Sequence, residues 1–504
     1  MSSTTTENYE VTHWIDGSEV AGTGATQPIM NPATGTQVGT LQLGDASTVD
    51  RAVEVALAAQ KEWAKVSLAK RTQIFYRMRQ LMLDHTDEIA RVISREHGKT
   101  VGDAKGEIAR GLETLEFATS ITQDLKGGFS ENVSTGIDAH TMRQPVGVVA
   151  GITPFNFPAM VPFWMHPVAL ATGNAFILKP SERDPSASNI VARLYQEAGL
   201  PEGVFQVVHG GKEVVDALCT HDGIAGVSFV GSTPIAKHVH ATASAAGKRV
   251  QALGGANNHA VIMPDANIEF AAGQVASGAF GSAGERCMAV PVAVTVGDAH
   301  EAFMAAITAE AEKLVVGPGD DPKTDMPPVI TKDARDRVIR MADEAEQAGA
   351  TIVVDGRGLV VEGFENGNFV GPTVITDLDR SHATYTDEVF GPLLVVMHVN
   401  NFDEALELVN SSPFGNGTAI FTDSGHYARR YQEEVEVGMI GINVPIPTPV
   451  GYYSFGGWKD SLFGEHHAHG PEGVSFYTKQ KAVTTRWPAQ NETVEASMSF
   501  PTHD

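Results

Sequence analysis

Hydrophobic and polar positions divide the chain into a helical first part and an alternating second part. Apolar residues recur at helical spacing in residues 47–63, where Asp50 follows Ser47 by three residues in the manner of a capping box, so we expect a helix that begins at Ser47. Residues 71–99 and 104–121 have the same period and predict two further helices. The apolar stripe predicted for the first helix consists of Val49, Val53, Ala56, Leu57 and Trp63.

From Val146 onward the period changes. Short β-branched runs alternate with helical segments, and they read VGVVAGI, AFILK, VFQVV, GVSFV and HAVIM. A second series follows Cys287, with VAVTV, TIVV, LLVVMHV, TAIFT and MIGINV. This alternation is typical of βαβ units, so the sequence predicts two α/β units with parallel sheets covered on both faces.

Length and charge exclude several classes of protein. A chain of 504 residues suggests about three domains, and a hydrophobic fraction of 42% is enough for a sizeable core. The net charge of −25 argues against nonspecific binding to nucleic acid or to anionic membranes. The uncharged stretch 144–178 is interrupted by Pro154, Pro158, Pro162 and Pro167, which argues against a membrane span.

Two cysteines in a chain of this length do not make a disulfide framework, so we expect a reducing compartment. The N-terminal segment MSSTTTENYEV lacks the basic and apolar regions of a signal peptide. These features together predict a cytoplasmic protein. Cys219 lies in an apolar helical pattern and is expected in the core.

Three short motifs could carry chemistry, each with a structural alternative. Gly231 follows a strand and precedes a helix in FVGSTPIAKHV, which suits either a phosphate or an ordinary turn. Lys179 and Glu182 in KPSERD lie after a buried strand, where α/β sheets bind ligands, although loop charges are often simply solvated. Asn156 in ITPFNFP is an oxyanion-hole donor or a turn former.

The segment FGSAGERCMAV contains the chain's second cysteine, Cys287. A free cysteine is often an inert core residue. Nearby glycines and the cation of Arg286 favour a reactive thiolate, so both interpretations stay open on local grounds. The segment EHHAHG, 465–470, offers three histidines but no nearby cysteine, so we expect a loop or interface rather than a metal site.

Considered in order, the motifs resemble those of the aldehyde dehydrogenase superfamily over residues 11–487. They are NPATG, ITPFNFP, LKPSE, FVGST, LGGANNHAVIMPDA, GERCMA, DEVFGP and PFGNGTAIFT. The resemblance implies an α/β fold with a Rossmann-like NAD domain (1–125 and 145–257) and a catalytic domain (258–460). It also implies a small β arm for oligomerisation, formed by 126–144 and 474–490.

The resemblance also implies roles for individual residues. Cys287 matches the catalytic thiol that forms a thioester, and Asn156 matches the oxyanion hole. The positions that match NAD-binding residues are Phe155, Lys179, Glu182, Arg183, Gly231, Ser232, Glu388 and Phe390. The carboxylate of Glu182 would repel a 2′-phosphate, which favours NAD over NADP.

Hydrolytic members of the superfamily carry a glutamate just before LGG, where it activates water, and this chain has Ala252 there. A positioned base contributes about 10²–10⁴-fold, so its absence favours a thiol such as coenzyme A as the acyl acceptor. The alternative is a hydrolytic enzyme for a small aldehyde that uses another base.

Within the superfamily, GERCMA, RGLETLEFA and the C-terminal region resemble the CoA-acylating methylmalonate-semialdehyde (malonate-semialdehyde) dehydrogenases. That resemblance implies that Arg110 and Arg286 hold the substrate carboxylate, and that products are propionyl-CoA or acetyl-CoA in valine or inositol breakdown. The family often has Gln where this chain has Glu285. The resemblance also implies a homo-oligomer, either a dimer or a tetramer. We expect no nucleic-acid partner, no membrane partner and no metal.

Overall fold

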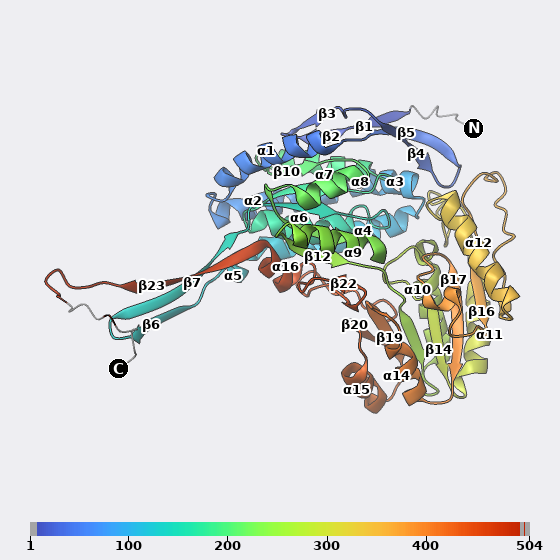
Figure 1. Ribbon diagram of the computed structural model, residues 1–504. Coiled ribbons are helices and arrows are strands. Elements are labelled where there is room, and N and C mark those ends of the chain that lie inside the picture. Colours follow the sequence, from blue (N-terminus) through green and yellow to red (C-terminus); the bar gives the residue numbers. More distant parts are fainter. Residues whose placement is uncertain (1–7, 494–497, 499–504) are drawn as a thin grey trace.

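The computed structural model describes residues 8–493 and 498. Two large sheets carry helices on their faces, and a three-stranded arm projects from one side (Figure 1). Residues 1–7, part of the segment in which no signal peptide is expected, lie outside the described residues. Among the described helices, none combines the length and the apolar character needed to cross a membrane.

The first sheet has eight strands in the order β22-β12-β11-β8-β9-β10-β2-β3. Its five central strands are parallel and comprise β8 (Val148–Ile152), β9 (Ala175–Lys179), β10 (Phe205–Val207), β11 (Ile224–Val230) and β12 (Arg249–Leu253). The first four match predicted runs, whereas the fifth run of that series, HAVIM, belongs to the second sheet. Its antiparallel edge strands are β2 (His13–Ile15), β3 (Ser18–Val20) and β22 (Leu462–Phe463). The short strand β12 has no strong sequence signal and was not predicted.

Helices cover both faces of this sheet. The alternation within β9 shows why residues 175–178 are all apolar, since Phe176 and Leu178 join one core while Ala175 and Ile177 join the other. The helices of the first core are α2 (Leu68–Asp84), α3 (Thr86–His97), α4 (Val101–Thr119), α6 (Met160–Ala171) and α7 (Ser186–Glu197). Those of the second are α1 (Ala46–Trp63), α8 (Lys212–Thr220) and α9 (Thr233–Ala245).

The second sheet has seven strands, parallel except at one edge. Their order is β15 (Thr351–Val354), β16 (Thr373–Thr376), β17 (Leu393–Val399), β14 (Val292–Val296), β13 (His259–Ile262), β19 (Gly417–Phe421) and β20 (Met439–Ile442), with β15 antiparallel. The accompanying helices are α10 (Ile268–Phe280), α11 (Ala299–Glu312), α12 (Lys332–Gln347), α13 (Ala383–Thr386), α14 (Phe402–Asn410) and α15 (Gly425–Glu434). All five runs predicted here are strands, which confirms the second α/β unit.

Smaller sheets complete the fold. One contains β1 (Tyr9–Val11), β4 (Thr26–Asn31) and β5 (Thr36–Gln42), and another pairs β18 (Phe414–Gly415) with β21 (Trp458–Lys459). The arm consists of β6 (Phe129–Ser134), β7 (Ile137–Pro145) and β23 (Thr478–Arg486).

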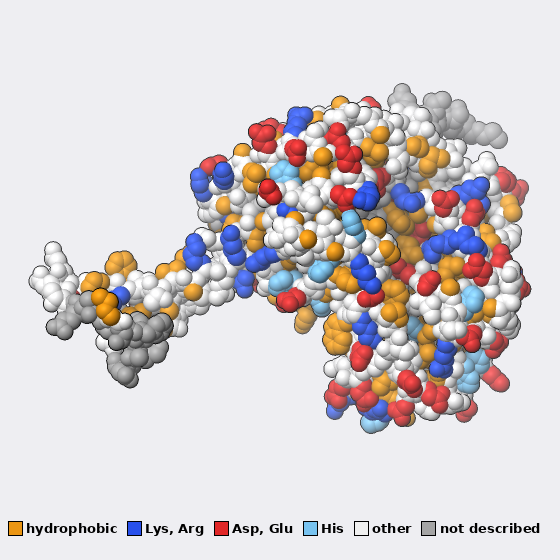
Figure 2. Space-filling model, in the orientation of Figure 1, with side chains coloured by type: hydrophobic (Ala, Val, Ile, Leu, Met, Phe, Trp, Pro, Cys, Tyr) orange, Lys and Arg blue, Asp and Glu red, His pale blue; other side chains and the backbone are white. Residues whose placement is uncertain are grey.

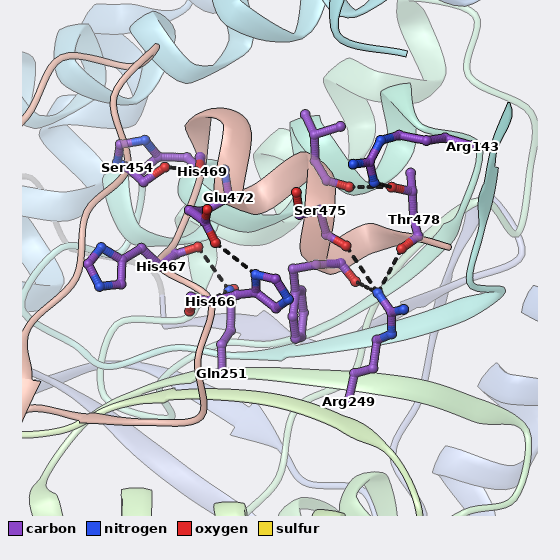
Figure 3. Close-up of polar contacts among 12 residues, drawn as sticks. Arg143, Arg249, Gln251, Ser454, His466, His467, His469, Glu472, Ser475 and Thr478 are labelled. Carbon is purple, nitrogen blue, oxygen red and sulfur yellow. Dashed lines mark hydrogen bonds and ion pairs between the residues drawn. The ribbon is translucent and has the colours of Figure 1, made fainter. Parts of the chain in front are cut away.

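The arm is anchored at the end of α16 (Gly470–Tyr477), which has no basic residue in its last turn. Arg249 of β12 donates to the carbonyl oxygens of Ser475, Phe476 and Thr478 at 3.0, 2.9 and 2.7 Å, and so satisfies the free end of the helix (Figure 3). Arg143 of β7 donates to the hydroxyl of Thr478 at 3.0 Å. The arm is thus tied to the central sheet.

Two helix predictions need correction. The first helix begins at Ala46 rather than Ser47, because Asp45 is the N-cap and forms the capping box with Thr48. In its predicted stripe Leu57 is 38% exposed, whereas the other four residues are buried. The segment 71–99 forms two helices, since α2 ends before His85, and 104–121 is covered by α4 and by α5 (Ile121–Asp124).

Candidate active site

Cys287 lies in a loop that follows α10 and the 3₁₀ turn Gly281–Gly284. Ser282, Ala283 and Gly284 have φ of 52°, 51° and 72°, so three successive residues adopt the left-handed conformation. A Cβ on Gly284 would lie 2.2 Å from the carbonyl oxygen of Gly391, so only glycine allows this approach. The strained turn brings the Cys287 loop close to the segment around Phe390.

Two asparagines hold the backbone of the nucleophile. The carbonyl oxygen of Cys287 accepts from the side-chain amides of Asn258 at 3.0 Å and Asn416 at 3.1 Å. Asn258 also accepts from the backbone N–H of Gly417 at 2.9 Å. Sequence reasoning missed both residues, although they lie inside the quoted motifs LGGANNHAVIMPDA and PFGNGTAIFT.

Cys287 opens onto a cleft of about 330 Å³. Figure 2 shows the surface hollowed between the two α/β units. Seven predicted site residues border this cleft, namely Cys287, Asn156, Phe155, Gly231, Ser232, Glu388 and Phe390. Arg337, which was not predicted, also borders it and donates to the carbonyl oxygen of Glu388 at 3.2 Å.

The surroundings of Cys287 disfavour the thiolate. Burial raises the pKa of its thiol to about 12, the charge of Glu388 adds to this, and Arg286 opposes it only weakly. The cation of Arg286 therefore acts in the predicted direction, but it does not outweigh burial and Glu388. Arg286 itself donates from Nη2 to Oδ1 of Asp103 at 2.7 Å.

Glu388 contacts the glycine-rich segment that follows β12. Its Oε1 accepts from the backbone N–H of Ala256 at 3.0 Å, and a Cβ on Gly255 would come within 2.6 Å of Oε2. Burial raises the pKa of Glu388 to about 7, against the opposing effects of this N–H and of Arg337. Glu388 is the only carboxylate among the residues that border the cleft.

Asn156 lies in the loop between β8 and α6 and is 2% exposed. Its Oδ1 is buried and has no hydrogen-bond partner among the described residues. Its backbone carbonyl accepts from Nζ of Lys99 at 2.6 Å. Because Asn156 and Cys287 border the same cleft, the amide is placed to serve a carbonyl oxygen bound at the thiol.

The other predicted cofactor residues lie at the carboxyl end of β9. Lys179 and Glu182 form an ion pair of 2.6 Å. The guanidinium of Arg183 lies 5.7 Å from the centre of the Phe155 ring, which contacts the Phe390 ring edge-on at 5.7 Å. This chain of contacts joins the end of β9 to the cleft.

The turn at Gly231 fits a dinucleotide. A Cβ on Gly231 would lie 2.6 Å from the ring of Phe229, so there is no room for a side chain at this position. Ser232 is the N-cap of α9 but makes no side-chain cap bond, and both residues border the cleft. Free N–H groups and the positive end of a helix dipole suit a phosphate group.

The two predicted carboxylate-binding arginines have separate protein partners. Arg110 pairs with Glu113 at 2.6 Å and donates to the carbonyl oxygens of Thr448 and Pro449 at 3.0 and 2.9 Å. Arg110 is not among the residues that border the cleft, whereas Arg286 borders a smaller hollow that shares Cys287, Glu388 and Phe390 with the cleft.

Ala252 is fully buried on β12, paired with Phe229 on one side and Phe463 on the other. Its methyl group belongs to the apolar core. The position therefore supplies no proton acceptor near the cleft.

The histidine-rich segment is a loop fixed to β12. The side chain of Gln251 donates to the carbonyl oxygens of His466 and His467 at 3.3 and 3.1 Å, and Nδ1 of His466 lies 2.8 Å from Glu472 (Figure 3). Within residues 8–493 and 498, no cluster of three or more His, Cys, Asp or Glu side chains could hold a metal ion.

Comparisons with known proteins place this geometry in context. The aldehyde dehydrogenase family model matches residues 20–483. A malonate-semialdehyde dehydrogenase of Pseudomonas aeruginosa is 49% identical over 97% of this chain and 99% of its own length. The mitochondrial acylating methylmalonate-semialdehyde/malonate-semialdehyde dehydrogenase of Bos taurus is 43% identical over 94% of this chain and 87% of its own length.

Solved structures give the same result. The methylmalonate-semialdehyde dehydrogenase of Oceanimonas doudoroffii superimposes with a TM-score of 0.94 at 51% identity, covering 95% of this chain and 99% of that one. A candidate methylmalonate-semialdehyde dehydrogenase of Sinorhizobium meliloti, solved with NAD, has a TM-score of 0.95 at 48% identity, covering 96% and 99%.

Proposed function

The chain belongs to the aldehyde dehydrogenase family, and we propose that it is an NAD-dependent, CoA-acylating semialdehyde dehydrogenase. Its substrate would be malonate semialdehyde, methylmalonate semialdehyde or both, as the names of its relatives suggest. The observation that carries the acylating step is Ala252, an apolar buried residue where hydrolytic members have their base.

The first step needs only this chain's own residues. The thiol of Cys287 gives up its proton to solvent, its sulfur bonds to the aldehyde carbon, and the carbonyl π electrons move to oxygen. The side-chain amide of Asn156 and the backbone N–H of Cys287 would stabilise that oxyanion. Bound NAD would supply the hydride acceptor, so that loss of the hydride from the former aldehyde carbon would leave a thioester on Cys287.

The residues suited to NAD are those of the cleft and of the end of β9. Gly231 and Ser232 would hold a phosphate, and Glu388 would hold ribose hydroxyls. Lys179 and Glu182 would do the same for the second ribose. NAD accompanies one of the matched structures, which supports this assignment.

Two further steps complete the reaction. Loss of CO₂ from the carbon beside the thioester leaves its electron pair as an enolate, which the Asn156 amide would also stabilise, and a proton then restores the acyl group. The thiol of coenzyme A attacks the thioester carbon and releases Cys287. A thiol needs less help from a base than water does, because a fair fraction ionises near neutral pH.

The test is NADH formation from malonate semialdehyde with and without coenzyme A, with mass spectrometry of the acyl product. We expect one burst per active site without coenzyme A and sustained turnover to acetyl-CoA with it. Full turnover without any thiol would overturn the acylating assignment. In that case Glu388→Gln would show whether the one carboxylate of the cleft activates water.

The structural units suggest further assignments. We propose that 1–125 with 145–257 is the NAD domain, 258–460 the catalytic domain, and 126–144 with 474–490 the arm. The arm exposes Phe129 and Trp487 by 66% and 84%, which supports burial of this surface in a dimer or tetramer. A cytoplasmic location agrees with the two cysteines, both free.

A further inference from the structure

Lys99 is a buried cation that the reaction above does not use. It immediately precedes α4, and its side chain is completely buried. An uncompensated ammonium is costly in a protein interior, so its partners define its role. Nζ donates to the carboxylate of Glu107 and to the backbone carbonyl oxygen of Asn156 at 2.6 Å, and it lies 4.4 Å from the centre of the Phe157 ring.

Glu107 contacts the same loop at the point where the loop ends and α6 begins. Its Oε1 accepts from the backbone N–H groups of Ala159 and Met160 at 2.9 and 3.3 Å. These groups begin α6, whose own N-cap residue makes no side-chain cap bond. The cap is therefore supplied from α4, across the core.

The loop that carries Asn156 is consequently held by one ion pair at Asn156 itself and at the point where α6 begins. Lys99 fixes the carbonyl of Asn156, and Glu107 fixes the start of α6 four residues later. Asn156 itself is among the residues that border the cleft. An oxyanion donor must be held in position before reaction, because a loose donor loses most of its effect.

We propose that Lys99, paired with Glu107, is a positioning residue that holds the Asn156 amide in place for the oxyanion. The inference rests on the proposed function only in that Asn156 serves the Cys287 reaction. It makes no use of coenzyme A or of a substrate carboxylate. An enzyme that oxidises propionaldehyde but never acylates coenzyme A would overturn the proposed function and leave this test intact.

The experiment is a double-mutant cycle on the rate of the NADH burst with propionaldehyde. Complete loss of an oxyanion donor costs about 10²–10³-fold, so we expect Lys99→Met to slow the burst by about 10- to 100-fold. In the Asn156→Ala background the same substitution should change the burst rate by less than about twofold, because the amide it positions is gone. Equal effects in both backgrounds would overturn the proposal.

Two controls separate positioning from folding. Lys99→Met leaves Glu107 buried without its cation, so the pair Lys99→Met with Glu107→Gln removes both charges and should recover much of the lost melting temperature. Its burst should stay slow, since the Asn156 carbonyl still lacks its donor; a wild-type burst in this variant would contradict the proposal. Lys105→Met, on the exposed side of α4, should leave the burst unchanged.

Discussion

Nη2 of Arg286 lies 2.7 Å from Oδ1 of Asp103, and this pair ties the residue before the nucleophile to the first turn of α4. Burial opposes the charge on Asp103, but Arg286 and Lys99 hold the pKa of its carboxyl below the usual value. Asp103 therefore stays ionised and accepts a hydrogen bond from one nitrogen of the guanidinium. Only the remaining N–H groups of Arg286 are free for a substrate carboxylate.

We expect Arg286→Ala to raise KM for malonate semialdehyde by about 10- to 100-fold, the value of a charged hydrogen bond, with little change for propionaldehyde. The variant also leaves the Asp103 carboxylate without its cation, so it should be less stable. Adding Asp103→Ala should restore stability without restoring KM. Steady-state kinetics on the two aldehydes measure the difference, and equal losses on both would refute a carboxylate contact.

Arg110 offers a contrasting case, because its guanidinium holds the loop at Thr448 and Pro449. If it also binds the substrate carboxylate, Arg110→Ala will raise KM for malonate semialdehyde well above the change for propionaldehyde. Glu113→Gln is the matched control, since it keeps the arginine and weakens only the ion pair. A uniform loss on both substrates would assign Arg110 to the loop alone.

Glu285 makes stability depend on pH. It is fully buried and accepts only from the N–H of Ile330, and burial raises its pKa to about 8. The unfolded carboxyl has a pKa of about 4.3, so between about pH 4.3 and 8 the unfolded state binds fewer protons and stability falls as pH rises.

Glu285→Gln keeps the acceptor for Ile330 and removes the charge. Its melting temperature should exceed that of the wild type at pH 8 and nearly equal it at pH 5, since one pKa unit is worth about 1.4 kcal/mol. Thermal melts across this range measure the effect, with the exposed Glu312→Gln as control. Parallel melting curves for variant and wild type would show that Glu285 does not titrate in this window.

Ala252→Glu tests whether the missing base alone determines the choice of acyl acceptor. The side chain would enter the apolar core beside Phe229 and Phe463, where burial keeps a carboxyl protonated. We therefore expect the variant to be destabilised and to gain little NADH turnover without coenzyme A. A large thiol-independent rate would show that β12 readily turns this position toward the cleft.

The sequence by itself determined the elements that local periodicity encodes. The short apolar runs between Val148 and Ile442 predicted most strands of the two sheets, because a buried parallel strand needs a continuous apolar run, but they missed β12 and β16. Ordered motifs identified Cys287, Asn156 and the alanine at 252, since chemistry requires particular side chains. The N-cap at Asp45 and the break at His85 were missed, because several polar residues there could serve equally well.

Only the tertiary structure decided what those residues contact. Asp103 and Arg286 are 183 positions apart, and Lys99 and Asn156 are 57 apart, so neither pairing has a local signal. The raised pKa of Cys287 has the same origin, because exclusion of water depends on every element packed around the thiol. Periodicity is a property of neighbours in sequence, whereas ion pairs and burial are properties of neighbours in space.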